Sequence, residues 1–330
     1  MGQSNSNELG AKSTALEVFE YFAIQKGKNF LQGKTVIVTG GNSGIGLETC
    51  KVFAYAGARV ILCSRSVASG ERAIEEEMKQ NGQGDYIVHD TSNVIVKQLD
   101  LNSLKSVKAF ADDVLVNESR IDYLICNAGI MALPNLELTE DGFEKQIGVN
   151  LFGHFYLTKL LLPKMQSQDF ETRVVVLSSS AHTMGTIVPS DLHFKNGRKY
   201  NNWTSYGQSK LADLLFAKEL ADRTKGTKMT AVSVHPGVIQ TNLWRSSFFS
   251  GGIASSFLGS VMANKTIPQG AATTIWACLS PTVLEEDRGA YCCDCKPVVP
   301  SVNGQDSDGT MRKELWRVVD EQISEVVKDF

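Results

Sequence analysis

The stretch Thr39-Gly40-Gly41-Asn42-Ser43-Gly44-Ile45-Gly46 decides the fold. It follows the β-branched run Thr35–Thr39 and opens the amphipathic run Gly44–Ala56, so we expect it to join a strand to a helix. Glycines at such a turn permit positive φ angles and let a phosphate approach the backbone. The free N–H groups of the following helix favour that anion. The spacing G-x-x-x-G-x-G therefore predicts a dinucleotide-phosphate loop; a plain strand–turn–helix is the alternative interpretation.

The rest of the chain alternates short β-branched runs with longer amphipathic runs. The expected strands are Thr35–Thr39, Arg59–Cys63, Val94–Gln98, Tyr123–Cys126, Val174–Leu177, Met229–Val234 and Gly289–Cys292. The expected helices are Gly44–Ala56, Ala68–Lys79, Leu104–Val116, Gly142–Met165, Ser205–Arg223 and Gln269–Leu279. This alternation is typical of a parallel sheet with helices on both faces. It predicts an α/β fold: one doubly wound, Rossmann-type domain with a mostly parallel seven-stranded sheet.

No linker or change of composition divides the chain. We expect residues 1–32 to form a polar tail and a lead-in helix, and residues 33–300 to form the dinucleotide-binding domain. Residues 301–330 are expected to form a polar loop and a closing helix over Gly309–Val327.

The composition excludes several classes of protein. The chain has 330 residues, is 42% hydrophobic and carries a formal net charge of −3, so no basic surface suggests nucleic acid binding. Seven scattered cysteines, an odd number, favour reduced thiols in a cytosol-like compartment. The cluster Cys292-Cys293-x-Cys295 lacks a second ligand pair, so we expect the buried end of a strand and no metal.

The N-terminus carries a targeting hint. Its first 20 residues lack the features of a secretory signal, and no apolar run is long enough to span a membrane. However, Met1-Gly2-Gln3-Ser4-Asn5-Ser6 fits the myristoylation pattern M-G-x-x-x-[ST]. We expect a cytoplasmic protein, weakly attached to a membrane if Gly2 is acylated. A polar disordered start is the alternative interpretation.

The end of the second expected strand indicates the cofactor. An acidic residue at this position binds the ribose 2′-hydroxyl of NAD, whereas a nearby arginine accommodates the 2′-phosphate of NADP. Here the strand continues Cys63-Ser64-Arg65 without a carboxylate. Arg65 therefore favours NADP(H) over NAD(H), unless its guanidinium is merely solvated.

Six short motifs resemble the short-chain dehydrogenase/reductase family and occur in that family's order. They are Thr39–Gly46, Asn127-Ala128-Gly129, Asn150, Ser178-Ser179-Ser180, Tyr206-x-x-x-Lys210 and Pro236-Gly237. The resemblance covers about residues 33–295. Cys63-Ser64-Arg65, Ser178-Ser179-Ser180-Ala181-His182 and the segment Gly289–Cys295 are similar to the retinol dehydrogenase branch.

Tyr206 and Lys210 lie four residues apart and so share one helix face. A free tyrosine titrates near pH ~10, too high for a base at neutral pH, and a neighbouring ammonium lowers the tyrosine pKa. Tyr206 is thus the expected catalytic acid/base. The resemblance implies that Ser179 holds the substrate oxygen. It also implies that a free backbone carbonyl of Asn150 binds a water that relays protons from Lys210.

The motifs together imply a cofactor site, and we expect no metal. Asp100 is one of the residues expected to bind the cofactor, beside the adenine; the alternative interpretation is that its side chain caps the next helix. The expected cofactor-binding residues are Gly40, Asn42, Ser43, Gly44, Ile45, Gly46, Arg65, Asp100, Leu101, Asn127, Ala128, Gly129, Tyr206, Lys210, Pro236, Gly237, Val238 and Thr241.

The substrate is suggested by an apolar segment. In the family a lid follows the sixth strand, and here residues 238–266 form a long segment with many apolar side chains, interrupted by three glycines. They suggest a hydrophobic retinoid, sterol or lipid aldehyde, or contact with a membrane. A role for the insertion at 182–204 cannot be predicted. The rival hypothesis is a catalytically silent NADP-binding scaffold or redox-sensing regulator. The family also implies a possible homodimer through Gly142–Met165 and Ser205–Arg223.

Overall fold

The computed structural model describes residues 8–79, 86–239 and 264–330. The strands are β1 (Thr35–Thr39), β2 (Arg59–Ser64), β3 (Val94–Gln98), β4 (Tyr123–Cys126), β5 (Thr172–Leu177), β6 (Met229–His235), β7 (Tyr291–Cys293) and β8 (Lys296–Val298). The α-helices are α1 (Ala15–Lys26), α2 (Gly44–Tyr55), α3 (Val67–Ala73), α4 (Leu104–Asn117), α5 (Lys145–Ile147), α6 (Gly153–Ser167), α7 (Asn202–Arg223), α10 (Ile267–Leu279), α11 (Thr282–Glu285), α12 (Val302–Gln305) and α13 (Thr310–Val326). The same described residues also form two π-helical turns, η1 (Ile74–Met78) and η2 (Gly148–Phe152), and three 3-10 segments, η3 (Ser180–Met184), η4 (Pro189–Asp191) and η5 (Val327–Asp329).

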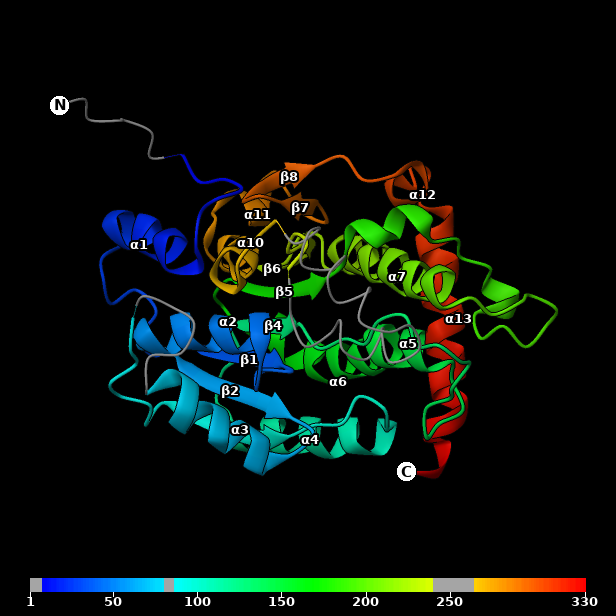
Figure 1. The fold of residues 1–330 in the computed structure, drawn as a ribbon, viewed down its shortest axis with the longest axis horizontal. Helices are drawn as coiled ribbons and strands as arrows, with labels where there is room; N and C mark the ends of the chain where they lie inside the picture. Colours follow the sequence, from blue (N-terminus) through cyan, green and yellow to red (C-terminus); the bar gives the residue numbers. More distant parts are fainter. Residues whose placement is uncertain (1–7, 80–85, 240–263) are drawn as a thin grey trace, which may run out of the picture.

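The strands form one sheet in the order β3-β2-β1-β4-β5-β6-β7-β8 (Figure 1). β1 pairs in parallel with both β2 and β4, so the chain winds outward in opposite directions from the middle of the sheet. In such a sheet the connections diverge at the carboxyl ends of the two central strands and leave a crevice for a ligand. The topology therefore places a ligand site where β1 and β4 end.

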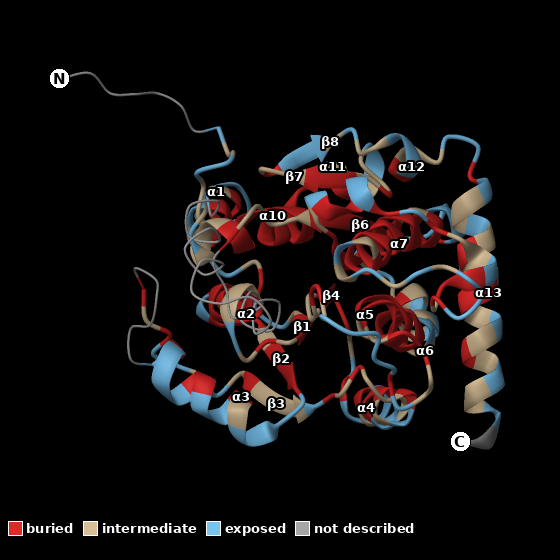
Figure 2. Cartoon of the chain, turned by 45° about the vertical axis from the view of Figure 1, so that its right-hand side comes forward, coloured by how far each residue is buried: buried red, intermediate tan, exposed pale blue. Residues whose placement is uncertain are grey.

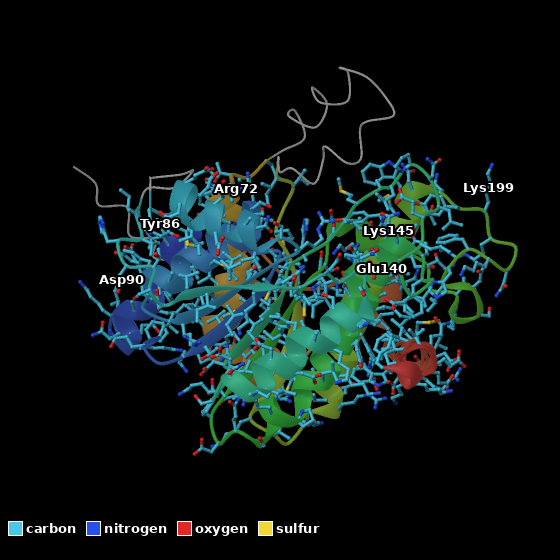
Figure 3. All side chains as sticks on the ribbon, turned by 90° about the horizontal axis from the view of Figure 1, so that it is seen from below. Arg72, Tyr86, Asp90, Glu140, Lys145 and Lys199 are labelled. Atoms are coloured by element: carbon cyan, nitrogen blue, oxygen red, sulfur yellow. The ribbon has the colours of Figure 1, made fainter. Side chains whose placement is uncertain are left out.

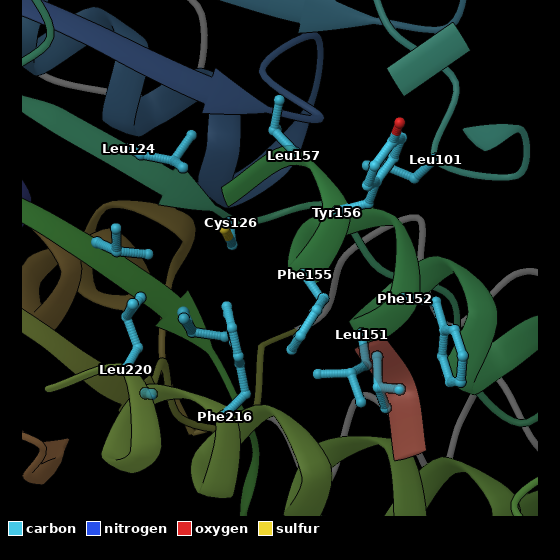
Figure 4. Packing of buried hydrophobic residues seen from close by; sticks show 14 of the residues in the cluster. Leu101, Leu124, Cys126, Leu151, Phe152, Phe155, Tyr156, Leu157, Phe216 and Leu220 are labelled. Atoms are coloured by element: carbon cyan, nitrogen blue, oxygen red, sulfur yellow. The ribbon is translucent and has the colours of Figure 1, made fainter. Parts of the chain in front are cut away.

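Helices cover both faces of the sheet. α1, α2 and α10 pack on one face, and α4, α6 and α7 pack on the other (Figure 1). Successive strand residues point to opposite faces, so Val36 and Val38 join the first layer while Ile37 joins the second. Phe155 of α6 and Phe216 of α7 meet in the second layer with ring centroids 5.4 Å apart (Figure 4). The α/β fold class is confirmed.

The sheet has eight strands where seven were expected. β8 pairs antiparallel with β7 and forms a short edge. Asp294 and Cys295, which join the two strands, both adopt positive φ, as a two-residue hairpin turn of this kind requires. Neither residue belongs to the asparagine–glycine pattern that usually marks such a turn. Pro297 in β8 is compatible with an edge strand.

The expected helix over Gly142–Met165 is broken into α5, η2 and α6. The N–H of Gly153 donates to the carbonyl of Gly148, five residues back, which is the bond of a π-turn. Asn150 lies inside this turn. Because π-turns depend on tertiary contacts, the 3.6-residue periodicity of the sequence did not reveal it.

The closing helix forms α13 and lies across α6 and α7, with its apolar side buried (Figure 2). The Trp316 ring lies 4.6 Å from that of Phe155 and 5.8 Å from that of Phe216. The expected dimer surface on α6 and α7 is therefore partly covered by this chain's own C-terminal helix.

The insertion at 182–204 forms η3, η4 and an outer loop that carries the exposed Lys199 (Figure 3). It is tied to α13, because His193 Nε2 lies 2.8 Å from Gln322 Oε1. The predictions for Gly2, for Thr241 and for most of the expected lid concern residues outside the described ranges. Within the described ranges, no helix has the length and apolarity needed to cross a membrane.

Candidate active site

A cleft of about 770 Å³ opens at the carboxyl ends of the central strands. Its walls come from the loops after β1 to β6 and from one side of α7. The residues that line it are Thr39, Gly40, Asn42–Gly46, Ser64–Ser66, Ser69, Leu99–Asn102, Asn127–Ile130, Lys145, Val149, Leu177, Ser178, Tyr206, Lys210 and Pro236. Most of the residues predicted from the sequence thus lie around one cavity.

The backbone of the glycine loop is open to close approach by a ligand. Gly40 and Gly44 have φ of 64° and 54°, which side chains rarely tolerate. A Cβ at Gly46 would meet both the carbonyl oxygen of Gly40 and Nδ2 of Asn127 at 2.4 Å. α2 begins at Gly44 without a side-chain cap, so its first N–H groups are left for an anion in the cleft.

The floor of the cleft is held by the end of β1. Thr39 Oγ1 accepts hydrogen bonds from the backbone N–H groups of Asn127 and Ala128, both at 2.9 Å. The Asn127 amide donates to the Thr39 carbonyl at 2.7 Å. These bonds fix the Asn127-Ala128-Gly129 segment beside the glycine loop. A Cβ at Gly129 would lie 3.3 Å from Asn150 Oδ1 and 3.6 Å from Lys210 Nζ, so Gly129 brings the segment close to both side chains.

The rim of the cleft beside β2 and β3 is where the adenine end of the cofactor is expected. Arg65 is exposed, and Asn42 Nδ2 donates to Ser69 Oγ at 3.0 Å nearby. Asp100 accepts from the N–H of Asn102 at 2.9 Å and lines the cleft. It does not cap α4 through its side chain, since Asp141 accepts the N–H of Leu104 at 2.9 Å instead. This cap joins residues 37 positions apart, so it could not be predicted from local sequence patterns.

Tyr206 and Lys210 both line the cleft from α7, and each is about nine-tenths buried or more. The Lys210 ammonium lies 5.9 Å from the centroid of the Tyr206 ring. It donates to the carbonyl of Leu177 at 2.8 Å and to Asp213 Oδ2 at 2.9 Å. Burial lowers the pKa of Lys210, but Asp213 and Tyr206 more than offset this and the pKa is raised. Lys210 is therefore a cation at neutral pH.

The three serines after β5 have different surroundings. Ser178 is buried, lines the cleft and donates from its hydroxyl to the Lys210 carbonyl at 2.7 Å. Ser179 is half-buried and begins η3, where its Oγ accepts from the N–H of Ala181 at 3.1 Å. Its hydroxyl proton is not used in that bond. Ser179 is not among the cleft-lining residues, although its neighbour Ser178 is.

Asn150 connects the cleft floor to α7. Its side chain accepts from the N–H of Ile130 at 2.8 Å, and donates to the Ile130 carbonyl at 3.0 Å and to Ser209 Oγ at 2.8 Å. Its backbone carbonyl lies 2.8 Å from His154 Nδ1. His154 Nδ1 therefore uses one of the two lone pairs of that carbonyl.

His154 bridges two parts of the site. It is 1% exposed, and its Nε2 lies 2.8 Å from Thr39 Oγ1. Burial lowers the pKa of His154 to about 4, so the ring is neutral. A neutral ring that donates through Nδ1 to Asn150 accepts through Nε2 from the Thr39 hydroxyl. The sequence did not single out His154, because a histidine four residues after Asn150 is an unremarkable helix residue.

The far end of the cleft follows β6. Pro236 lines it, and Gly237 has φ of 93°, with Lys265 where a side chain would lie. The backbone N–H of Val238 donates to Asn264 Oδ1 at 3.3 Å. Lys145 and Val149 also line the cleft, but the sequence did not single them out as site residues. Among the described residues, no cluster of metal-ligating side chains is found.

A doubly wound sheet with a glycine loop and a tyrosine–lysine pair at one cleft defines a class of nucleotide-dependent oxidoreductase. A model of the short chain dehydrogenase family matches residues 34–191. The chain belongs to the short-chain dehydrogenase/reductase family, and it is an oxidoreductase that acts on alcohol or carbonyl groups.

The similar curated proteins place the chain more closely. It is 42% identical to retinol dehydrogenase 11 of Homo sapiens, over 87% of this chain and 85% of the relative. It is 40% identical to retinol dehydrogenase 14 of Homo sapiens, over 90% and 87%. Within the family the chain stands in the retinol dehydrogenase-like branch.

Solved structures agree with this fold. An uncharacterised protein from Mycobacterium paratuberculosis matches with a TM-score of 0.67 and 34% identity, over 89% of this chain and 94% of that one. A 3-ketoacyl-(acyl-carrier-protein) reductase from Brucella melitensis, complexed with NADH, matches with a TM-score of 0.60 and 23% identity, over 80% and 97%. At that identity the second match supports the fold alone.

Proposed function

We propose that this chain is an NADP(H)-dependent oxidoreductase that interconverts an alcohol and a carbonyl on a hydrophobic substrate, with Tyr206 as the acid/base. The observation that carries the proposal is the position of Tyr206 and Lys210 in the same cleft as the glycine loop. A scaffold would need the loop to bind a nucleotide, but it would not need a tyrosine beside a buried ammonium.

The cleft fits a dinucleotide. The glycine loop and the start of α2 would hold the pyrophosphate, with Gly46 leaving the backbone open. Asp100 and Leu101 would lie beside the adenine, and Arg65 would pair with a 2′-phosphate. Gly237 and Val238 would lie toward the nicotinamide, and Thr241, outside the described residues, is proposed as a cofactor-binding residue from the sequence alone. NAD(H) is the less favoured cofactor, because Arg65 stands where an acidic residue would bind its ribose.

The protein's own residues would move the proton and orient the substrate. When bound, the cofactor supplies or accepts the hydride at its nicotinamide. Tyr206 gives its phenolic proton to the carbonyl oxygen during reduction and takes it back during oxidation. The Lys210 ammonium stabilises the phenolate. Ser179 holds the substrate oxygen, and the second lone pair of the Asn150 carbonyl binds a water that returns protons toward Lys210.

The proposed substrate is a retinoid or a similar lipid aldehyde. Two observations support it: the similar curated proteins are named retinol dehydrogenases, and residues 238–266 are rich in apolar side chains. The NADP preference favours reduction as the physiological direction. Acylation of Gly2, a weak attachment to membranes and a cytoplasmic location are further parts of this proposal. So is a homodimer, which would use the parts of α6 and α7 that α13 leaves uncovered.

A substrate panel tests the function. The purified protein is incubated with NADPH or NADH and with retinaldehyde and unbranched aldehydes and ketones of graded chain length, and the alcohol product and the oxidised cofactor are quantified after chromatographic separation. We expect turnover with NADPH that rises with chain length and includes retinaldehyde. NADPH binding without turnover of any carbonyl would favour the scaffold hypothesis instead.

A further inference from the structure

Asp213 lies next to Lys210 on the same side of α7, three residues further along the helix, and belongs to none of the motifs described above. Its side chain is 1% exposed and that of Lys210 is 7% exposed, with 2.9 Å between the ammonium and Oδ2. A buried ion pair in direct contact with the expected catalytic pair is an uncommon and costly arrangement. It therefore calls for a functional explanation.

The ammonium of Lys210 is fixed from two sides. Two of its three N–H donors point inward, to the carbonyl of Leu177 and to Asp213. On the cleft side it lies against Gly129, where a Cβ would be 3.6 Å from Nζ. The third donor is therefore the one left for the cleft, where Lys210 is a lining residue. Asp213 selects this orientation by occupying one inward donor.

We propose that Asp213 is a positioning residue for Lys210: its buried carboxylate holds the ammonium toward the cleft and keeps it charged beside Tyr206. This inference rests on the proposed function, because the charge matters for the proton exchange of Tyr206. The carboxylate itself touches neither the cleft nor the substrate site.

The surroundings of Asp213 explain why its charge matters. Asp213 interacts with Lys210 on its own helix and with Cys126 of β4, while His154 of α6 acts on Lys210. Burial raises the pKa of Cys126 to about 12 and lowers that of His154 to about 4, so both are neutral at pH 7. No neighbouring anion other than Asp213 is thus available to hold the Lys210 proton in this part of the described chain.

The pair is ionic across the physiological range. Burial raises the pKa of Asp213 to about 6, and Lys210 opposes that rise. The pKa of Lys210 is itself raised, with Asp213 as the main favourable cause. Without the carboxylate only the effect of burial and the weaker help of Tyr206 would act on Lys210, and its pKa would fall.

The direct test is a titration of Lys210 in Asp213→Asn, which keeps the shape of the side chain and removes its charge. Protein labelled with ¹³C at the lysine ε-carbons is followed by NMR from pH 7.5 to 10, above the range in which Asp213 itself titrates, without cofactor or substrate, and Lys210→Met assigns the signal. The wild-type Lys210 signal should not move over this range. In Asp213→Asn it should titrate below the other lysines, which titrate near pH ~10.4. An unmoved signal in the variant overturns the proposal.

A matched control is available on the same helix. Asp222 is 55% exposed, and Asp222→Asn should leave the Lys210 signal unchanged. If Asp213→Asn does not fold, the wild-type titration still decides: a Lys210 that loses its proton below pH 9 contradicts the proposal. Because no turnover is measured, a failed carbonyl panel and a failed titration are separate results.

Turnover provides the second measurement. The ratio of Asp213→Asn to wild-type kcat for NADPH-dependent reduction should fall as the pH rises from 7 to 9, because Lys210 loses its proton in the variant only. A purely structural role would lower kcat by the same factor at both pH values, and that outcome overturns the proposal.

Discussion

His154 makes the stability of the protein depend on pH in a calculable way. Burial lowers its pKa from 6.5 to about 4, so the folded protein binds this proton less readily than the unfolded chain. The stability it contributes is complete above pH 6.5 and is lost as the pH falls toward 4. A shift of this size amounts to about 3 kcal/mol in full, of which about 2 kcal/mol is lost between pH 7.5 and pH 5.

The perturbation is His154→Gln, measured by urea unfolding at pH 7.5 and pH 5. At pH 7.5 the variant should be less stable than the wild type by about 2 kcal/mol, since it weakens the two bridging hydrogen bonds at about 1 kcal/mol each. At pH 5 the two proteins should be about equally stable, because only the wild type pays for an uncharged, buried histidine. His235, whose pKa is also lowered to about 4, titrates alike in both proteins and cancels.

His89→Gln is the matched control, because His89 is exposed. The free energies of unfolding of this variant and the wild type should differ by the same amount at pH 7.5 and at pH 5. A difference between wild type and His154→Gln that stays constant from pH 7.5 to pH 5 would refute the reasoning. It would mean that His154 is solvated or carries a charge in the folded protein.

Two predictions concern the cofactor site. Gly46→Ala places a Cβ 2.4 Å from Gly40 O and Asn127 Nδ2, so we expect NADPH affinity, measured by fluorescence titration, to fall at least tenfold. Gly10→Ala is the control, because a Cβ there would lie in open space and should leave the affinity unchanged. Tight NADPH binding by Gly46→Ala would contradict the geometry of the loop. Arg65→Ala should lower kcat/KM for NADPH by about 30-fold, equivalent to loss of about 2 kcal/mol of charge-assisted hydrogen bonding, with little change for NADH. Equal losses for the two cofactors would show that Arg65 does not read the 2′-phosphate.

Much of the fold could be predicted because its signals are local. β5 reads as the continuous apolar run Val174–Leu177, as a strand buried on both faces must, and the glycine loop stands between its strand and helix at the expected spacing. Tyr206 and Lys210 were predictable as a pair because four residues of helix return to the same face.

The rest depends on contacts that a single sequence does not display. The π-turn at Gly148–Phe152 and the β7–β8 hairpin arise from packing and from positive φ at Asp294 and Cys295. His154 acquires a role only because the fold brings Thr39, more than a hundred residues away, to its ring. Asp213 could not be distinguished from an ordinary helix residue in the sequence. Its ion pair with Lys210, and the burial of both side chains, are seen only in the structure.

The central claim is that Tyr206 exchanges a proton with a substrate held beside a bound nicotinamide. The measurement that tests it most directly compares kcat for carbonyl reduction and the Kd for NADPH in wild type and Tyr206→Phe. The account predicts that kcat falls at least ~100-fold, the scale expected for loss of a general acid, while the Kd changes less than threefold, within about 0.7 kcal/mol. A variant that keeps turnover within tenfold of the wild type would contradict it.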